Sequence, residues 1–220
     1  GASTRLTCPG EVLRGTRSYR ADGDSRTWSA VQVAADAKVL AQYVSRCRKA
    51  AGTLLPYITS DQTARDADLV RHLLGYRTAD YYGVSYGTWL GALLEKMFPN
   101  RMARVVLDAN TDWASGSFDR VFSYQAEAFQ AQFDRVFLPW LARHDDVFGL
   151  GSSAAATNDT YERLRAAVAR HAFGSAVSPD MLDRYLAAAQ YDPSGWDETG
   201  AFLGRMDAAL GGDVAAYLDV

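Results

Sequence analysis

One serine, Ser85, stands in a pattern that is typical of a catalytic nucleophile. Glycines lie two positions before it and two positions after it, at Gly83 and Gly87. This G-x-S-x-G pattern places a serine on a sharp strand-to-helix turn, the nucleophile elbow, where only small neighbours fit. The helix that follows presents backbone N–H groups and its positive dipole end to a developing oxyanion. We therefore predict Ser85 as the nucleophile and the backbone N–H of Tyr86 as an oxyanion donor. The alternative is a turn in which Ser85 is only structural.

The segments around this serine supply the elements that such a turn requires. Residues 81–84 are apolar and aromatic and predict a short buried strand, and residues 88–97 predict a helix. Residues 104–109 contain three β-favouring apolar residues in a row, which predicts a second buried strand. Upstream, helical spacing of apolar residues predicts helices over residues 29–49 and 61–74. The alternation of helix and strand predicts an α/β fold with a parallel sheet.

From about residue 113 the pattern changes to helices alone. Helical patterns cover residues 118–140, 160–172, 179–190, 201–210 and 214–218, with a flexible connector over residues 149–158. Aromatic residues recur at helical spacing in the first of these: Phe118, Phe122, Tyr124, Phe129, Phe133, Phe137 and Trp140. We interpret them as the core of a helical cap, with a substrate-lining role for some as the alternative. The prediction is an α/β core segment, residues 1–112, and an all-helical cap, residues 113–220.

Composition limits the class of protein. The 220 residues are 48% hydrophobic and 22% charged, with a net charge of −3, as in a globular protein. The sequence gives no basic face for nucleic acid, no apolar run near the ~20 residues of a membrane span, and no metal-ligand, P-loop or dinucleotide pattern. Residues 1–5 lack the features of a signal peptide, as a mature secreted protein also would. The two cysteines, Cys8 and Cys47, are either separate core residues or a disulfide, and the sequence alone leaves both open.

The partners of a catalytic serine are harder to find. In this type of fold the order along the chain is serine, acid, histidine, and the last two follow later strands. His144 and His171 lie downstream of the serine, but in predicted helices with no strand before them, and His72 lies upstream on a packing or solvent face of its helix. Asp108 follows a strand and is a candidate acid, with a structural role as the simpler interpretation; Asp112 is a weaker candidate. We expect the triad histidine and acid to lie outside this chain, on remaining segments of the same hydrolase.

Several stretches of the chain carry a resemblance to a known family. They are residues 59–75, residues 80–91 (DYYGVSYGTWLG), Phe98-Pro99, residues 105–108 (VVLD), the first residues GAST with Cys8, and Tyr191-x-Pro193, Trp196 and Gly212-Asp213 near the end. These stretches resemble the secreted tripeptidyl aminopeptidases of actinomycetes, which are α/β-hydrolases related to proline iminopeptidase. The resemblance covers most of residues 1–108 and patches of the cap.

The resemblance implies a secreted serine aminopeptidase that releases short peptides from N-termini through an acyl-enzyme on Ser85. It also implies a disulfide between Cys8 and Cys47. Acids of the cap would bind the free amine of the peptide substrate, and the candidates are Glu127, Asp134, Asp145 and Asp146. No cofactor, nucleic acid or membrane partner is expected. An esterase or lipase-like hydrolase, and a non-catalytic binding or assembly module, remain the alternatives.

Overall fold

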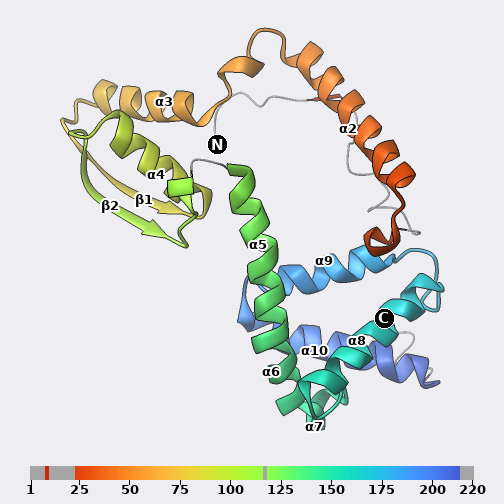
Figure 1. The fold of residues 1–220 in the computed structure, drawn as a ribbon. Helices are drawn as coiled ribbons and strands as arrows, with labels where there is room; N and C mark the ends of the chain where they lie inside the picture. Colours follow the sequence, from red (N-terminus) through yellow and green to blue (C-terminus); the bar gives the residue numbers. More distant parts are fainter. Residues whose placement is uncertain (1–7, 10–22, 116–117, 214–220) are drawn as a thin grey trace. The chain divides into compact units, whose positions relative to one another are not determined.

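The structure is a computed structural model that describes residues 8–9, 23–115 and 118–213 (Figure 1). Its internal contacts form two units. The strand unit contains the residues from Arg48 to Ala126, and the helical unit contains Cys8–Cys47 and the residues from Glu127 onward. The predicted division between residues 112 and 113 stays a prediction.

The strand unit alternates helices and strands. It contains α3 (Ser60–Leu73), β1 (Ala79–Val84), α4 (Tyr86–Met97) and β2 (Met102–Asp108), with 3₁₀ turns at Leu55–Tyr57 and Trp113–Ser115. The two strands are parallel and adjacent, with Tyr81 opposite Val105 and Val84 opposite Asp108. The helix α4 is the crossover between them and packs against both, and α3 packs against α4 (Figure 1). The predicted parallel strands and the helices on either side of Ser85 are confirmed.

The faces of the strand pair differ in burial. Tyr81 is half-buried and Gly83 is buried, whereas Tyr82 and Val84, which point the other way, are exposed. Neighbouring strand residues alternate between faces, so one face of the pair lies against α4. The sequence predicted strands buried on both faces, as is usual in parallel sheets. Within the described residues only the α4 face is covered, and Val106 keeps 54% of its surface exposed.

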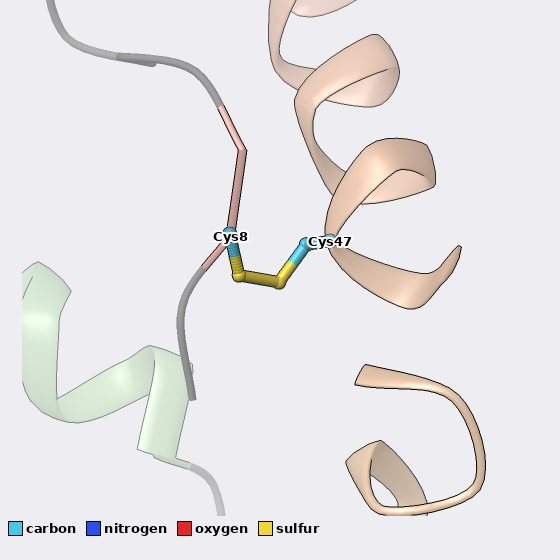
Figure 2. The surroundings of a disulfide bond; sticks show 2 residues. All are labelled: Cys8 and Cys47. Atoms are coloured by element: carbon cyan, nitrogen blue, oxygen red, sulfur yellow. A yellow bond between two sulfur atoms is a disulfide. The ribbon is translucent and has the colours of Figure 1, made fainter. Parts of the chain in front are cut away.

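The helix α2 (Ala30–Ala51) carries one half of the disulfide. Figure 2 shows the sulfur of Cys47, close to the end of this helix, bonded to the sulfur of Cys8. The Cα atoms of the two residues are 4.5 Å apart. The pairing implied by the family resemblance is therefore confirmed.

The helical unit packs around one apolar core. Its helices are α5 (Phe118–Gln132), which starts in the strand unit, α6 (Leu138–Arg143), α7 (Asp145–Phe148), α8 (Ala154–Ala169), α9 (Pro179–Ala189) and α10 (Trp196–Leu210). The core consists of Phe137, Leu141, Leu150, Tyr161, Leu164, Val168, Leu182, Leu186, Trp196, Leu203 and Met206. Phe133 and Trp140 pack against this core, and Phe129 meets Tyr191 edge to face, whereas Phe122 is 57% exposed. No strand occurs among the described residues of this unit.

Two predicted helical segments differ in detail from the structure. The predicted helix over residues 118–140 is interrupted by a π-helical turn at Phe133–Phe137, where the N–H of Leu138 donates to the carbonyl of Phe133. The irregular turn directly precedes Pro139, which has no N–H to continue the α-helical ladder. The predicted connector over residues 149–158 is shorter, because the Ser153 side chain accepts from the N–H of Ala156 and starts α8 at Ala154. The predicted helix over residues 214–218 lies outside the described residues.

Candidate active site

Ser85 lies at the turn between β1 and α4 in an unfavourable backbone conformation. Its φ is 54° and its ψ is −118°. A positive φ is uncommon for any residue other than glycine, and a backbone outlier of this kind costs of order 1–3 kcal/mol. The residue is exposed. A strained, exposed serine at the end of a strand is a feature that surrounding contacts must maintain.

The glycines on either side of Ser85 allow the chain to approach itself closely. A Cβ on Gly83 would lie 2.5 Å from the carbonyl oxygen of Gly87, which is backbone and cannot move aside. That carbonyl oxygen also accepts a 2.6 Å hydrogen bond from the Tyr81 hydroxyl. Tyr81 is half-buried, and burial raises the pKa of its hydroxyl, which keeps it in the form that donates. The sequence pattern around Ser85 therefore has a local steric explanation.

The peptide groups on both sides of Ser85 are held by hydrogen bonds. The N–H of Ser85 donates to the carbonyl of Asp108 at the end of β2, at 3.1 Å. The carbonyl of Ser85 accepts from both the N–H and the hydroxyl of Thr88, at 2.9 and 2.7 Å. These contacts fix the orientation of the serine backbone relative to both strands.

Tyr86, the predicted oxyanion donor, is the first residue of α4. Backbone N–H groups at the start of a helix point out along its axis, and the helix dipole makes this end partly positive. The Tyr86 side chain is 42% exposed, and its hydroxyl pairs with the Ser60 hydroxyl at 2.8 Å. Ser60 is the first residue of α3, so this pair ties the start of α3 to the start of α4.

Asp108, the candidate acid, ends β2 beside the Ser85 turn. Its backbone carbonyl accepts from the Ser85 N–H, and its carboxylate accepts a 2.8 Å hydrogen bond from the hydroxyl of Tyr82. That bond to a carboxylate raises the pKa of Tyr82. The structure thus brings the backbone of Asp108 to Ser85, while the exposed carboxylate is engaged by a strand residue. Asp112, the weaker candidate, is also exposed.

Of the three histidines, His72 lies within a helix as predicted, whereas His144 and His171, which were predicted in helical segments, lie in turns. His72 is exposed on α3, and His171 is exposed just after α8. His144 lies between α6 and α7, where its Nδ1 is 2.8 Å from the carbonyl of Trp140 and its ring packs beside the Trp140 ring. His72, which belongs to the same unit as Ser85, makes no hydrogen bond to it within the part of the chain that the structure describes.

The four candidate acids for binding an amine belong to the helical unit. Asp145 accepts a 2.6 Å hydrogen bond from the N–H of Gly151, and Asp134 accepts one from the amide of Gln130 at 2.9 Å. Glu127 and Asp146 are exposed. These contacts do not rank the four acids. Among the described residues no group of histidines, cysteines and acids has a metal-binding arrangement, and no described helix is long and apolar enough to cross a membrane.

Sequence reasoning missed the threonines that support the Ser85 turn. Thr88 is fully buried, and its hydroxyl contacts both the backbone N–H and the hydroxyl of Thr111, which follows β2. The position of Thr88 three residues after the serine, on the face that packs on the strands, was visible in the sequence. The position of Thr111 was not, because it depends on how the loop after β2 folds back.

Comparison with known proteins finds that the chain is similar to peptidases and to a putative hydrolase. The whole chain matches peptidases, and it is 31% identical over 226 aligned residues to the tripeptidyl aminopeptidase of Streptomyces lividans. It is also 32% identical over 94 residues, 42% of the chain, to serine protease Hip1 of Mycobacterium tuberculosis. A third match is the putative hydrolase YuaR of Escherichia coli, 29% identical over 110 residues, or 48% of the chain. No protein-family model matches the chain.

The resemblance to tripeptidyl aminopeptidases that the motifs predicted is thereby confirmed. The chain covers 40% of the length of the Streptomyces lividans protein, 18% of Hip1 and 21% of YuaR. It therefore corresponds to about two fifths of the length of the first of these relatives.

Proposed function

We propose that this chain carries the nucleophile of a serine peptidase with an α/β-hydrolase fold, and that the nucleophile is Ser85. The observation that carries this proposal is the strained backbone of an exposed serine between a parallel strand and a helix. On this view the turn is a nucleophile elbow, and the close approach of Gly83 to Gly87 is what allows it. The match to peptidases along the whole chain supports the same assignment.

The proposed reaction is acyl transfer in two steps. The Ser85 Oγ forms a bond with the carbonyl carbon of the scissile peptide, and its proton passes to a histidine base. The Tyr86 N–H donates to the oxyanion of the tetrahedral intermediate, a contact whose loss in such sites costs about 10²–10³-fold in rate. The C–N bond then breaks, and the histidine returns the proton to the leaving amine. Water releases the acyl group by the same route.

The histidine and its orienting acid are proposed to come from outside residues 1–220. His72 makes no hydrogen bond to Ser85 among the described residues, His144 and His171 follow helices rather than strands, and the Asp108 carboxylate accepts from Tyr82. Remaining segments of the same hydrolase, present as further chain or as separate polypeptides, would supply both residues.

The proposed substrate is a peptide with a free N-terminus. The support is the similarity to tripeptidyl aminopeptidases. The helices of the helical unit are proposed to form the cap that binds this substrate, with one of its acids at the substrate amine. The disulfide between Cys8 and Cys47 supports an oxidising, extracellular location.

A fluorophosphonate probe and intact-mass spectrometry test the nucleophile. The protein is expressed from its natural reading frame and purified together with any polypeptides that accompany it. We expect one adduct, mapped to Ser85, which is absent in Ser85→Ala. The control Ser45→Ala, at an exposed serine of α2, should keep the adduct. An adduct on another residue, or none in a preparation that retains its companions, contradicts the proposal.

Substrate class is tested on the same preparation with matched compounds. A tripeptide p-nitroanilide with a free amine should be cleaved, and its N-acetylated form should be cleaved at least about tenfold more slowly if a charged contact to the amine is lost. Cleavage of simple esters alone would identify an esterase instead. No cleavage and no labelling would leave a binding module as the function.

A further inference from the structure

The Thr88 hydroxyl takes part in three hydrogen bonds next to the serine. It lies in the first turn of α4 and none of its surface is exposed. Its hydroxyl donates to the carbonyl oxygen of Ser85 at 2.7 Å. A hydroxyl has one proton, so the two remaining contacts must be donated by Thr111. These are the backbone N–H of Thr111, at 3.0 Å, and its hydroxyl, at 3.1 Å.

The same carbonyl is held a second time. The backbone N–H of Thr88 also donates to the Ser85 oxygen, at 2.9 Å. The oxygen therefore accepts two bonds from one residue, and that residue is anchored by the loop that follows β2. The contact set links the ends of both strands through a single buried side chain.

Holding this carbonyl has a consequence for the neighbouring N–H. The Ser85 carbonyl and the Tyr86 N–H belong to one planar peptide group and point in opposite directions. An orientation imposed on the oxygen is therefore imposed on the N–H as well. It also sets the ψ of Ser85, which at −118° lies outside the usual wells for a residue with positive φ.

We propose that Thr88 is a positioning residue, which holds the Ser85–Tyr86 peptide group so that the Tyr86 N–H points at the oxyanion. The inference rests on the proposed role of Ser85 as the nucleophile. On this proposal the Thr88 hydroxyl acts indirectly, by orienting a group that stabilises the transition state, and does not bind substrate. Its hydrogen bonds all go to backbone and to Thr111, which leaves no donor for a ligand.

The test compares the isosteric variant Thr88→Val with Thr88→Ser, which keeps the hydroxyl. Misdirecting one oxyanion donor should slow fluorophosphonate labelling of folded Thr88→Val by about 10- to 100-fold, less than outright removal of a donor. Thr88→Ser should label within about threefold of the wild type. With a peptide substrate, Thr88→Val should lower kcat and leave KM within about twofold, as expected for an interaction made in the transition state.

A matched control separates positioning from general stability. Thr157 is also buried, at 2% exposed, and its hydroxyl donates to the backbone carbonyl of Gly151 in the helical unit. Thr157→Val should lower the melting temperature and leave the labelling rate of the folded protein unchanged. If Thr88→Val does not fold, Thr111→Val is used. It removes only the Thr111 hydroxyl and should slow labelling by a smaller factor, about two- to fivefold.

The outcomes distinguish this inference from the proposed function. A wild type that labels at Ser85, together with a Thr88→Val variant that labels equally fast, overturns the inference and leaves the nucleophile in place. An equal loss in Thr88→Val and Thr157→Val also overturns it, because stability alone would then explain the effect. A wild type that never labels at Ser85 overturns the proposed function, and the inference with it.

Discussion

The two units of the chain use different means to hold their residues in place. In the helical unit, large apolar side chains such as Phe137 and Leu164 form one continuous core. In the strand unit, Leu94 is the one large apolar side chain that is fully buried among the described residues. The other buried positions around the serine are small or polar, such as Gly83, Thr88 and Gly91. The site is therefore positioned by backbone contacts and short hydrogen bonds rather than by a large core.

Exposed apolar side chains occur in both units, and Val147 of the helical unit is 66% exposed. The helix α3 keeps Leu69 and Leu73 53% and 73% exposed, and Tyr82 on β1 is 64% exposed. The local geometry of the Ser85 turn is nonetheless complete, because the bonds that hold it are made within β1, α4, the end of β2 and the loop after β2. The large apolar core and the geometry of the Ser85 turn therefore lie in different parts of this chain, and we expect substitutions in each to have separate effects.

The largest expected effect is on the core of the helical unit. Leu164 is 0% exposed, and Leu164→Ala should lower the free energy of unfolding by about 3–5 kcal/mol through lost burial and a residual cavity. Urea unfolding followed by circular dichroism measures this change. Leu73→Ala in the strand unit is the control, and at 73% exposure it should change the free energy by less than about 0.5 kcal/mol. Equal costs at the two leucines would remove the difference between the units.

The disulfide is expected to contribute the next largest amount. It closes a chain separation of 39 residues, for which the loss of loop entropy in the unfolded state amounts to roughly 3–4 kcal/mol. Replacing both Cys8 and Cys47 by serine should lower the stability of the helical unit by about this amount. Hydrogen exchange of α8 reports it. Unchanged protection of α8 in the double variant would show that the disulfide does not support this unit.

A smaller effect, dependent on pH, is expected at Tyr161. Burial raises the pKa of its hydroxyl, and a hydrogen bond donated to Asp183 raises it further. Because the folded state holds the proton more tightly, the contribution to stability is complete below the ordinary pKa near 10 and is lost as the pH rises above it. Below pH 10, Tyr161→Phe should cost about 2 kcal/mol, because it removes both the hydrogen bond donated to Asp183 and the one accepted from Arg26.

Unfolding experiments between pH 8 and about pH 11 test whether the stabilising contribution of Tyr161 is lost as the pH rises. The wild type should lose stability above pH 10 faster than Tyr161→Phe, so that the two curves approach each other. Tyr57→Phe, at an exposed tyrosine of the strand unit, is the matched control and should follow the wild type. Parallel curves for the wild type and Tyr161→Phe across this range would refute the assignment.

The sequence was most informative close to Ser85. Glycine spacing and hydrophobic periodicity located β1, α4 and β2 to within two residues of their ends, because these are local signals. The disulfide followed from the family resemblance alone, since two cysteines without a structure do not specify a pair. The π-helical turn was missed because a shift of one residue in hydrogen bonding leaves the apolar pattern almost unchanged.

Contacts between distant parts of the chain could not be predicted. The bonds from Thr111 to Thr88 depend on how a loop returns after a strand. The same holds for the ion pairs of Arg165 with Asp24 and Asp183, which attach residues near the start of the chain to α8 and α9. Burial alone would lower the pKa of Arg165, but these carboxylates outweigh it and raise the pKa. Such networks are visible only after the helices are packed.

The most direct test of the central claim is to trap the acyl-enzyme on Ser85. The protein, purified together with any polypeptides that accompany it, is mixed with a slowly deacylating peptidyl ester that has a free amine, quenched in acid within seconds, and digested for mass spectrometry. The account predicts a mass increase equal to the acyl group on the peptide that contains Ser85, and none in Ser85→Ala. Turnover of the ester without any acyl adduct on Ser85, or with the adduct on another residue, would contradict it.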